Sequence, residues 1–153
     1  MPTSPVQLAR RWFEEVWNQR RDDAIAELIA PACSGFIQGH GEVYGLEDVA
    51  AVRARFLSAF PDLSVEVEDV VADGDKVVAR WVAHATHEGP GLGIEPSGHP
   101  CEFRGLTWLE FEGGKVVRGW DSWDQGGLLE ELRGYGTRSA RDQNPGDAGE
   151  PPL

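Results

Sequence analysis

The sequence is short of several features that whole classes of protein require. Its only two cysteines, Cys33 and Cys101, stand far apart and outside any CxxC spacing, so it carries neither a disulfide framework nor a zinc motif. We interpret them as two isolated reduced thiols. Basic residues are also scarce: 14 Lys and Arg face 26 Asp and Glu, for a formal net charge of -12. Because so negative a surface repels phosphate backbones and anionic lipids, we expect no nucleic-acid partner and no membrane partner.

Long hydrophobic runs are absent as well. No stretch approaches the roughly 18 apolar residues of a membrane-spanning helix, and Arg10 and Arg11 interrupt the only apolar stretch near the N-terminus. We therefore expect a soluble, cytoplasmic protein. The 153 residues fit one domain, and 41% hydrophobic residues suffice for an ordinary core.

The first third of the chain predicts helices. Ser4 followed by Pro5 is typical of a helix start, and apolar residues recur at helical spacing up to Asn18 (Val6, Ala9, Trp12, Phe13, Val16 and Trp17). A second helix is expected from about Asp22 to a point before Pro31. A third is expected over residues 45–60.

After residue 61 the apolar period changes from 3.6 to 2, which predicts strands over residues 63–71, 76–87, 102–111 and 116–123. A further short strand is expected over residues 34–39. Residues 88–100 are rich in Gly and Pro and predict a loop at the edge of a pocket. A short helix is expected around Leu128–Leu132. The remaining residues, low in apolar content, predict a disordered tail. Helices followed by antiparallel strands indicate an α+β fold, with a cavity between a curved sheet and the helices.

Several phrases, in this order, resemble one known family. They are RWFEEVWNQRRDDAIAELIAP, FPDL, HEGPGLGIEPSGHPCEFRG and LEFEGGKVVRGWDSWDQGGLLEEL. They are similar to the SnoaL-like polyketide cyclases of the nuclear transport factor 2-like superfamily, over roughly Val6 to Leu132. The resemblance implies a cone-shaped α+β fold, with three N-terminal helices against a strongly curved, mostly antiparallel sheet that encloses a pocket. The domain would span residues 4–133, followed by a disordered tail at 134–153, and it would form a homodimer or a higher homo-oligomer.

The resemblance also implies a chemistry. The cyclases close a ring by an intramolecular aldol condensation, without a metal or an organic cofactor. Their general acid/base, an aspartate in the last strand, falls on Asp121. They place a histidine in the preceding strand where this chain has Thr107. The implied function is a cofactor-free cyclase or isomerase acting on a hydrophobic, polyketide-like small molecule. An epoxide hydrolase or dehydratase in the same pocket, and a non-catalytic ligand-binding or dimerisation module, are the alternatives.

The residues themselves give two catalytic candidates. Asp121 lies between Trp120 and Trp123, with Trp108 on the neighbouring strand. An apolar setting would raise the pKa of its carboxyl group, which could then act as base and as acid. The alternative is an exposed strand residue without a role. Asp124 would face the other side of a regular strand. It precedes the QGGLLEEL segment, so it is either a helix N-cap or a second catalytic residue.

The remaining candidates would bind substrate. His40 and His87 match positions that are often histidine in the family, so each either lines the pocket mouth or is a structural histidine. Arg80 lies among apolar strand residues, which predicts a salt bridge inside or beside the cavity, or a contact to a substrate oxygen. We also expect aromatic and polar pocket walls to bind substrate (Trp17, Thr107, Trp108 and Trp123). The four histidines lack metal-binding spacing, so we expect no metal site.

Overall fold

The N-terminal helix begins as the sequence predicts. In the computed structural model, which describes residues 3–90 and 95–142, α1 spans Pro5–Arg11. The hydroxyl of Ser4 accepts a hydrogen bond from the backbone N–H of Gln7 at 3.2 Å. The Gln7 side chain accepts one from the Ser4 N–H at 2.9 Å. This reciprocal capping box confirms the predicted start.

The same helix then widens into a π-helix, η1 (Trp12–Asn18). Its i to i−5 hydrogen bonding continues into the C-cap, where the Gln19 N–H donates to the carbonyl of Glu14 at 2.8 Å. Apolar periodicity does not distinguish a π-helix from an α-helix, so the sequence did not predict this change. A π-helical turn alters the direction of the side chains it carries and is common at functional sites.

Helix α2 (Asp22–Leu28) ends earlier than Pro31, and strand β1 (Ile29–Ile37) follows at once. The strand is longer than predicted and includes the proline, which a strand tolerates where no ladder hydrogen bond needs its nitrogen. A short strand that the sequence did not predict, β2 (Gly41–Tyr44), pairs with it. Helix α3 (Gly45–Ala59) confirms the third predicted helix.

Four long strands complete a single six-stranded sheet of order β2-β1-β6-β5-β4-β3. They are β3 (Ser64–Asp73), β4 (Lys76–Thr86), β5 (Pro100–Glu112) and β6 (Lys115–Trp123). Neighbours are antiparallel except β1 and β6, which run parallel and place Ile37 beside Asp121. This confirms the mostly antiparallel sheet. Irregular register in β3 and at Glu110/Phe111 is of the kind that bends strands.

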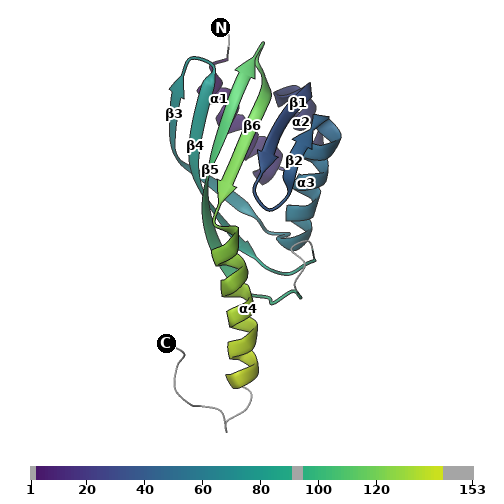
Figure 1. Ribbon diagram of the computed structural model, residues 1–153, viewed down its shortest axis with the longest axis vertical. Helices are drawn as coiled ribbons and strands as arrows, with labels where there is room; N and C mark the ends of the chain where they lie inside the picture. The colour runs from purple at the N-terminus through teal and green to yellow at the C-terminus, as the bar shows by residue number, and fades with distance from the viewer. Residues whose placement is uncertain (1–2, 91–94, 143–153) are drawn as a thin grey trace.

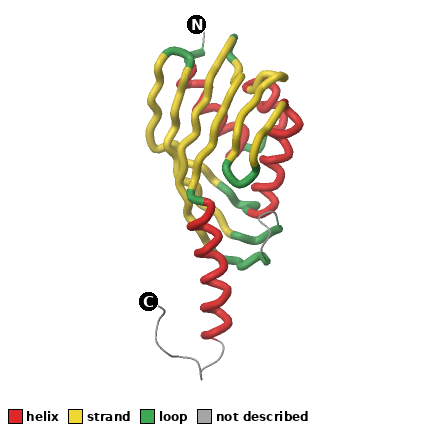
Figure 2. The backbone as a smooth tube through the Cα atoms, in the orientation of Figure 1, coloured by secondary structure: helices red, strands yellow, loops and turns green. Residues whose placement is uncertain are grey.

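The helices α1, α2 and α3 cover one face of the sheet (Figures 1 and 2). The core lies between them and includes an aromatic chain that links helix to sheet. Ring centroids are 6.1 Å apart for Trp17–Phe56, 5.5 Å for Phe56–Trp123 and 5.0 Å for Phe103–Trp123. The predicted α+β cone is therefore the observed fold.

A last helix, α4 (Gln125–Asp142), follows β6 and extends beyond the sheet (Figure 1). The sequence predicts a short helix and then a tail from residue 134, whereas the backbone of residues 134–142 continues the helix. Residues 143–153 of that predicted tail lie outside the described residues. Among the described helices, none is long and apolar enough to cross a membrane.

Candidate active site

A pocket of about 490 Å³, including its mouth, lies between the sheet and the helices η1 and α3. Its wall is aromatic and aliphatic, contributed by helices and strands from the whole chain (Trp12, Phe13, Trp17, Phe56, Leu63, Trp81, Phe103 and Trp123). The π-helix supplies three of these rings, so its altered geometry directly shapes the pocket.

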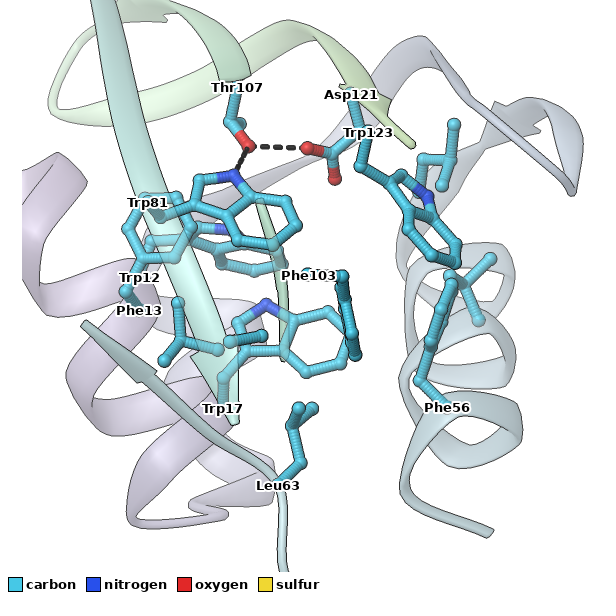
Figure 3. A pocket seen from close by; sticks show the side chains of 14 residues that line it. Trp12, Phe13, Trp17, Phe56, Leu63, Trp81, Phe103, Thr107, Asp121 and Trp123 are labelled. Carbon is cyan, nitrogen blue, oxygen red and sulfur yellow. Dashed lines mark hydrogen bonds between the residues drawn. The ribbon is translucent and has the colours of Figure 1, made fainter. Parts of the chain in front are cut away.

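The polar end of the pocket is a pair of residues on neighbouring strands. Thr107 on β5 and Asp121 on β6 are directly opposite each other in the antiparallel ladder. The Thr107 hydroxyl donates a short hydrogen bond to Oδ1 of Asp121. Figure 3 shows both at one end of the pocket, with the second carboxylate oxygen pointing toward the aromatic rings.

Trp81 determines the direction of that hydrogen bond. Its indole Nε1–H donates to the Thr107 oxygen at 2.9 Å. An indole nitrogen can only donate, so the single hydroxyl proton of Thr107 is left for Asp121. Gly105 makes this contact possible, because a Cβ there would lie 2.5 Å from the Trp81 ring and 2.8 Å from the Cβ of Trp123. The chain Trp81–Thr107–Asp121 therefore orients the carboxyl group and leaves its second oxygen available to a ligand.

The surroundings of Asp121 change its acidity. Burial raises the pKa of Asp121 to about 6, and the Thr107 hydrogen bond opposes part of that rise. Desolvation disfavours the charged carboxylate, whereas a hydrogen bond donated to it favours the charge. With a pKa of about 6, the group can both take up and release a proton near neutral pH.

Four of the predicted site residues meet in this pocket: Trp17, Thr107, Asp121 and Trp123. The second catalytic candidate does not. Asp124 accepts a hydrogen bond from the Gly127 N–H at 3.0 Å and caps α4, which is the N-cap alternative. Because β6 ends at Trp123 and α4 begins at Gln125, Asp124 stands just before the helix, and its carboxylate points into the first turn.

Neither histidine candidate lines the pocket. His87 is fully buried, packs on Phe60 with ring centroids 5.8 Å apart, and has its Nδ1 3.2 Å from the Ser97 hydroxyl. Burial lowers its pKa, as expected for a neutral structural imidazole. His40 lies in an exposed turn, 3.5 Å from a guanidinium nitrogen of Arg55. The structural alternative therefore fits His87, and the pocket-mouth prediction is wrong for both.

Arg80 and Trp108 lie on the outer face of the sheet, so the prediction that they contact substrate in this pocket is wrong. Strand alternation decides both positions, since each is next in sequence to a residue that points inward. The Arg80 side chain is 57% exposed and forms a long ion pair with Glu68 at 3.9 Å. Trp108 is 41% exposed and packs edge-on against Trp120 at 6.5 Å. The apolar setting of Asp121 comes from the pocket wall, to which Trp123 contributes and Trp108 does not.

The sequence interpretation also missed pocket residues. Phe103 could have been found, because it shares a strand face with Thr107 by period-2 alternation. Ile37 could not, since it reaches the pocket only through the parallel pairing of β1 with β6.

This arrangement of a curved sheet, covering helices and a carboxyl group in an apolar pocket is that of the nuclear transport factor 2-like fold. Within that fold the chain belongs to the SnoaL-like polyketide cyclase family, whose profile matches residues 7–132. A comparison with curated protein sequences gives no match.

Solved structures agree with this assignment. A candidate SnoaL-like polyketide cyclase from Jannaschia sp. CCS1 is 26% identical, with a TM-score of 0.79 over 86% of this chain and 96% of that one. IdmH, a candidate polyketide cyclase from Streptomyces antibioticus, is 27% identical, with a TM-score of 0.76 over 86% of this chain and 99% of that one. AclR, a candidate hydroxylase from Streptomyces galilaeus, is 29% identical, with a TM-score of 0.73 over 85% of this chain and 96% of that one.

Proposed function

We propose that this protein is a cofactor-free cyclase or isomerase, with Asp121 as the general acid/base for aldol-type chemistry on a polyketide-like small molecule. One observation carries the proposal. Among the described residues that line the aromatic pocket, Asp121 is the one carboxylic acid, and burial raises its pKa to about 6. A carboxyl group tuned toward neutrality in an apolar pocket is typical of proton-transfer catalysis.

In the proposed reaction, the free carboxylate oxygen removes a proton from a carbon beside a carbonyl group of the bound substrate. The resulting enolate carbon attacks a second carbonyl carbon of the same molecule, which forms the new C–C bond. The oxygen of that second carbonyl becomes an alkoxide and takes the proton back from Asp121. The carboxylate is thereby restored, and no other reactant is needed.

The lining also supports an uncharged substrate. No Lys, Arg or His is among the described residues that line the pocket. A buried anionic group on the substrate would lack a counter-charge, and it would meet a chain of net charge -12. We therefore expect a neutral ketone or ester rather than a free acid.

The test uses a simple flat ketone, 2-tetralone, in deuterated buffer. We expect the protein to accelerate exchange of the protons beside the carbonyl, measured by NMR. Asp121→Asn should lose about 10²-fold or more of that acceleration. The matched control is Asp124→Asn, which alters a carboxylate outside the pocket and should exchange at the wild-type rate. Equal exchange by the wild type and Asp121→Asn, or none above buffer in the wild type, contradicts the proposal.

The alternative reactions have less support from the geometry. Epoxide opening or dehydration by a carboxylate pair bridged by arginine would need Asp124 and Arg80 beside Asp121. Asp124 caps α4 and Arg80 is exposed on the outer face. A purely non-catalytic binding module gives no reason for an aspartate oriented by Trp81 and Thr107.

We also propose that the protein forms a homodimer through the outer face of the sheet. Register places Phe36 beside Trp120, and Trp120 beside Trp108, in one row across β1, β6 and β5. Each of these side chains is more than 40% exposed. Contiguous exposed apolar residues on a folded chain are typical of an interface.

A further inference from the structure

A second cavity adjoins the aromatic pocket at Asp121. It is lined by residues of β1, β2, α3, β5 and β6, together with Trp12 of η1. Four residues line both cavities: Trp12, Ile37, Thr107 and Asp121. The carboxyl group therefore lies at a waist between two lobes. We call the first cavity the aromatic lobe and the second the aliphatic lobe.

The two lobes differ in the shape of ligand that they suit. Residues that line only the aromatic lobe include Trp17, Phe56, Phe103 and Trp123, whose flat faces suit a ring system. Those that line only the aliphatic lobe are mostly branched or small apolar side chains (Ile29, Cys33, Val43, Val49, Leu109 and Val116). Such walls suit an alkyl group. No Lys, Arg or His is among the described residues of either lining.

Two glycines line the aliphatic lobe. Gly35 on β1 lies beside Gly119 on β6, and a Cβ on Gly35 would lie 2.1 Å from the Gly119 carbonyl oxygen. Close approach of the two strands therefore requires glycine at position 35. A Cβ on Gly119 would meet only ordinary contacts, the nearest being Leu109 Cδ2 at 3.4 Å. The packing around Gly119 thus leaves room for a methyl group. Unfilled apolar space of this kind destabilises a fold.

We propose that the substrate is a neutral molecule in two parts, with a flat ring system in the aromatic lobe, an aliphatic part in the aliphatic lobe, and the reacting carbonyl group between them at the waist. The inference rests on the proposed function only in taking Asp121 as the reacting group. The division of the ligand between the lobes follows from the two linings and can be measured by binding alone.

The probes are 6-acyl-2-(dimethylamino)naphthalenes, whose acyl chain is lengthened from acetyl to hexanoyl. Each is neutral and fluorescent, and each joins a flat ring to an alkyl chain through a carbonyl group. Fluorescence titration of the full chain should show an affinity that rises about fourfold for each added methylene, the usual gain for burying one CH₂. An affinity that does not rise with chain length, or no binding of any member, overturns the inference.

Substitutions of residues that line the lobes show which lobe holds the acyl chain of the probe. In Val43→Phe the new ring fills the aliphatic lobe, so the chain-length dependence should disappear while the acetyl compound keeps its affinity. Gly119→Ala is the milder variant, because its methyl group has room, and it should reduce the gain for the longest chains. Circular dichroism checks that both fold. Ala83→Val, which narrows only the aromatic lobe, is the matched control. It should weaken every probe by a similar factor and leave the gain per methylene unchanged.

If Val43→Phe and Gly119→Ala fold and still show the wild-type chain-length dependence, the acyl chain of the probe does not lie in the aliphatic lobe. That result would overturn the inference. The binding result is separable from catalysis, because Asp121→Asn should show the wild-type chain-length dependence. Absence of proton exchange above buffer in the wild type, with its chain-length dependence intact, would count against the proposed function alone. Exchange without any chain-length dependence would count against the two-lobed substrate alone.

Discussion

The carboxyl group of Asp121 should destabilise the folded protein at neutral pH, and Asp121→Asn should remove that destabilisation. Burial raises its pKa from the ordinary 3.8 to about 6. Between these two values the folded chain holds a proton that the unfolded chain has lost. The free energy of unfolding therefore falls as the pH rises through this window, and the loss is complete above about pH 6.

The magnitude follows from the same two values. Going from 3.8 to about 6 is a difference of about two pH units. At about 1.4 kcal/mol per unit, Asp121 lowers the free energy of unfolding by at most about 3 kcal/mol at pH 7. Asparagine has nearly the same shape, and its amide oxygen can still accept the Thr107 hydrogen bond, but it does not ionise. Asp121→Asn should thus be more stable than the wild type at pH 7, by up to this amount.

The assay is urea unfolding of both proteins, followed by tryptophan fluorescence, at pH values from about 4 to 8. The difference between the variant and the wild type should grow with pH up to about 6 and then level off. Any fixed effect of the new amide group appears as a constant offset, so the pH dependence alone reports the ionisation.

Asp124→Asn is the control for the general effect of removing a charge. Its carboxylate caps a helix outside the pocket, and the substitution should leave the pH dependence of stability as in the wild type. A stability difference for Asp121→Asn that does not change between about pH 4 and 8 would refute the reasoning. Asp121→Asn could also show the expected gain in stability over the wild type and yet keep full exchange activity. The carboxyl group would then be buried but not catalytic, which would count against the proposed mechanism.

Three further outcomes are expected. Thr107→Val removes the hydrogen bond that favours the carboxylate form of Asp121, so the pH at which exchange activity reaches half its maximum should rise; Thr107→Ser should restore it, and no shift would show that the hydroxyl does not act on Asp121. Asp124→Ala should lose about 1 kcal/mol of stability through the lost helix cap, with the exchange rate per folded molecule unchanged; a loss of rate would return Asp124 to the active site. Trp120→Lys should convert the homodimer to monomers in sedimentation equilibrium, whereas Arg80→Lys, elsewhere on the same face, should not; an unchanged mass for Trp120→Lys would move the interface elsewhere.

Local chemistry made much of the fold predictable. Ser4 favours the first helix start because its side chain accepts a hydrogen bond from a free backbone N–H group. Pro5 favours it because proline has no N–H group that would need a partner there. Both effects depend only on neighbours in sequence. Period-2 alternation gave the long strands, because one face of each must be apolar. Strand β2 was not predicted, because its four residues carry too little alternation. Only part of β1 was predicted, because Pro31 is typical of a break.

The position of Asp121 in the last strand was also predictable, through the motif that it shares with the cyclases. Its surroundings were not. The sequence puts Trp120 next to it and Trp108 on the adjacent strand, but alternation turns both to the outer face. Trp123, two residues away, does line the pocket with it, but most of the other rings of the wall come from helices and strands distant in sequence. Likewise, the sequence allows Asp124 to be a cap or a catalyst, and the end of β6 at Trp123 places it at the N-cap of α4.

Most of the helices and strands, the mostly antiparallel order and the candidate acid can be predicted from the chain alone, because these depend on local preference, on polar and apolar periodicity, and on a short motif. The contact of Trp81 with Thr107 across Gly105, and the place of Asp121 between an aromatic and an aliphatic lobe, arise only in the folded protein. Both depend on strand register, on the parallel pairing of β1 with β6, and on the approach of Gly35 to Gly119. These pairings join residues distant in the chain, and their geometry is set by close packing of the whole core rather than by any segment alone.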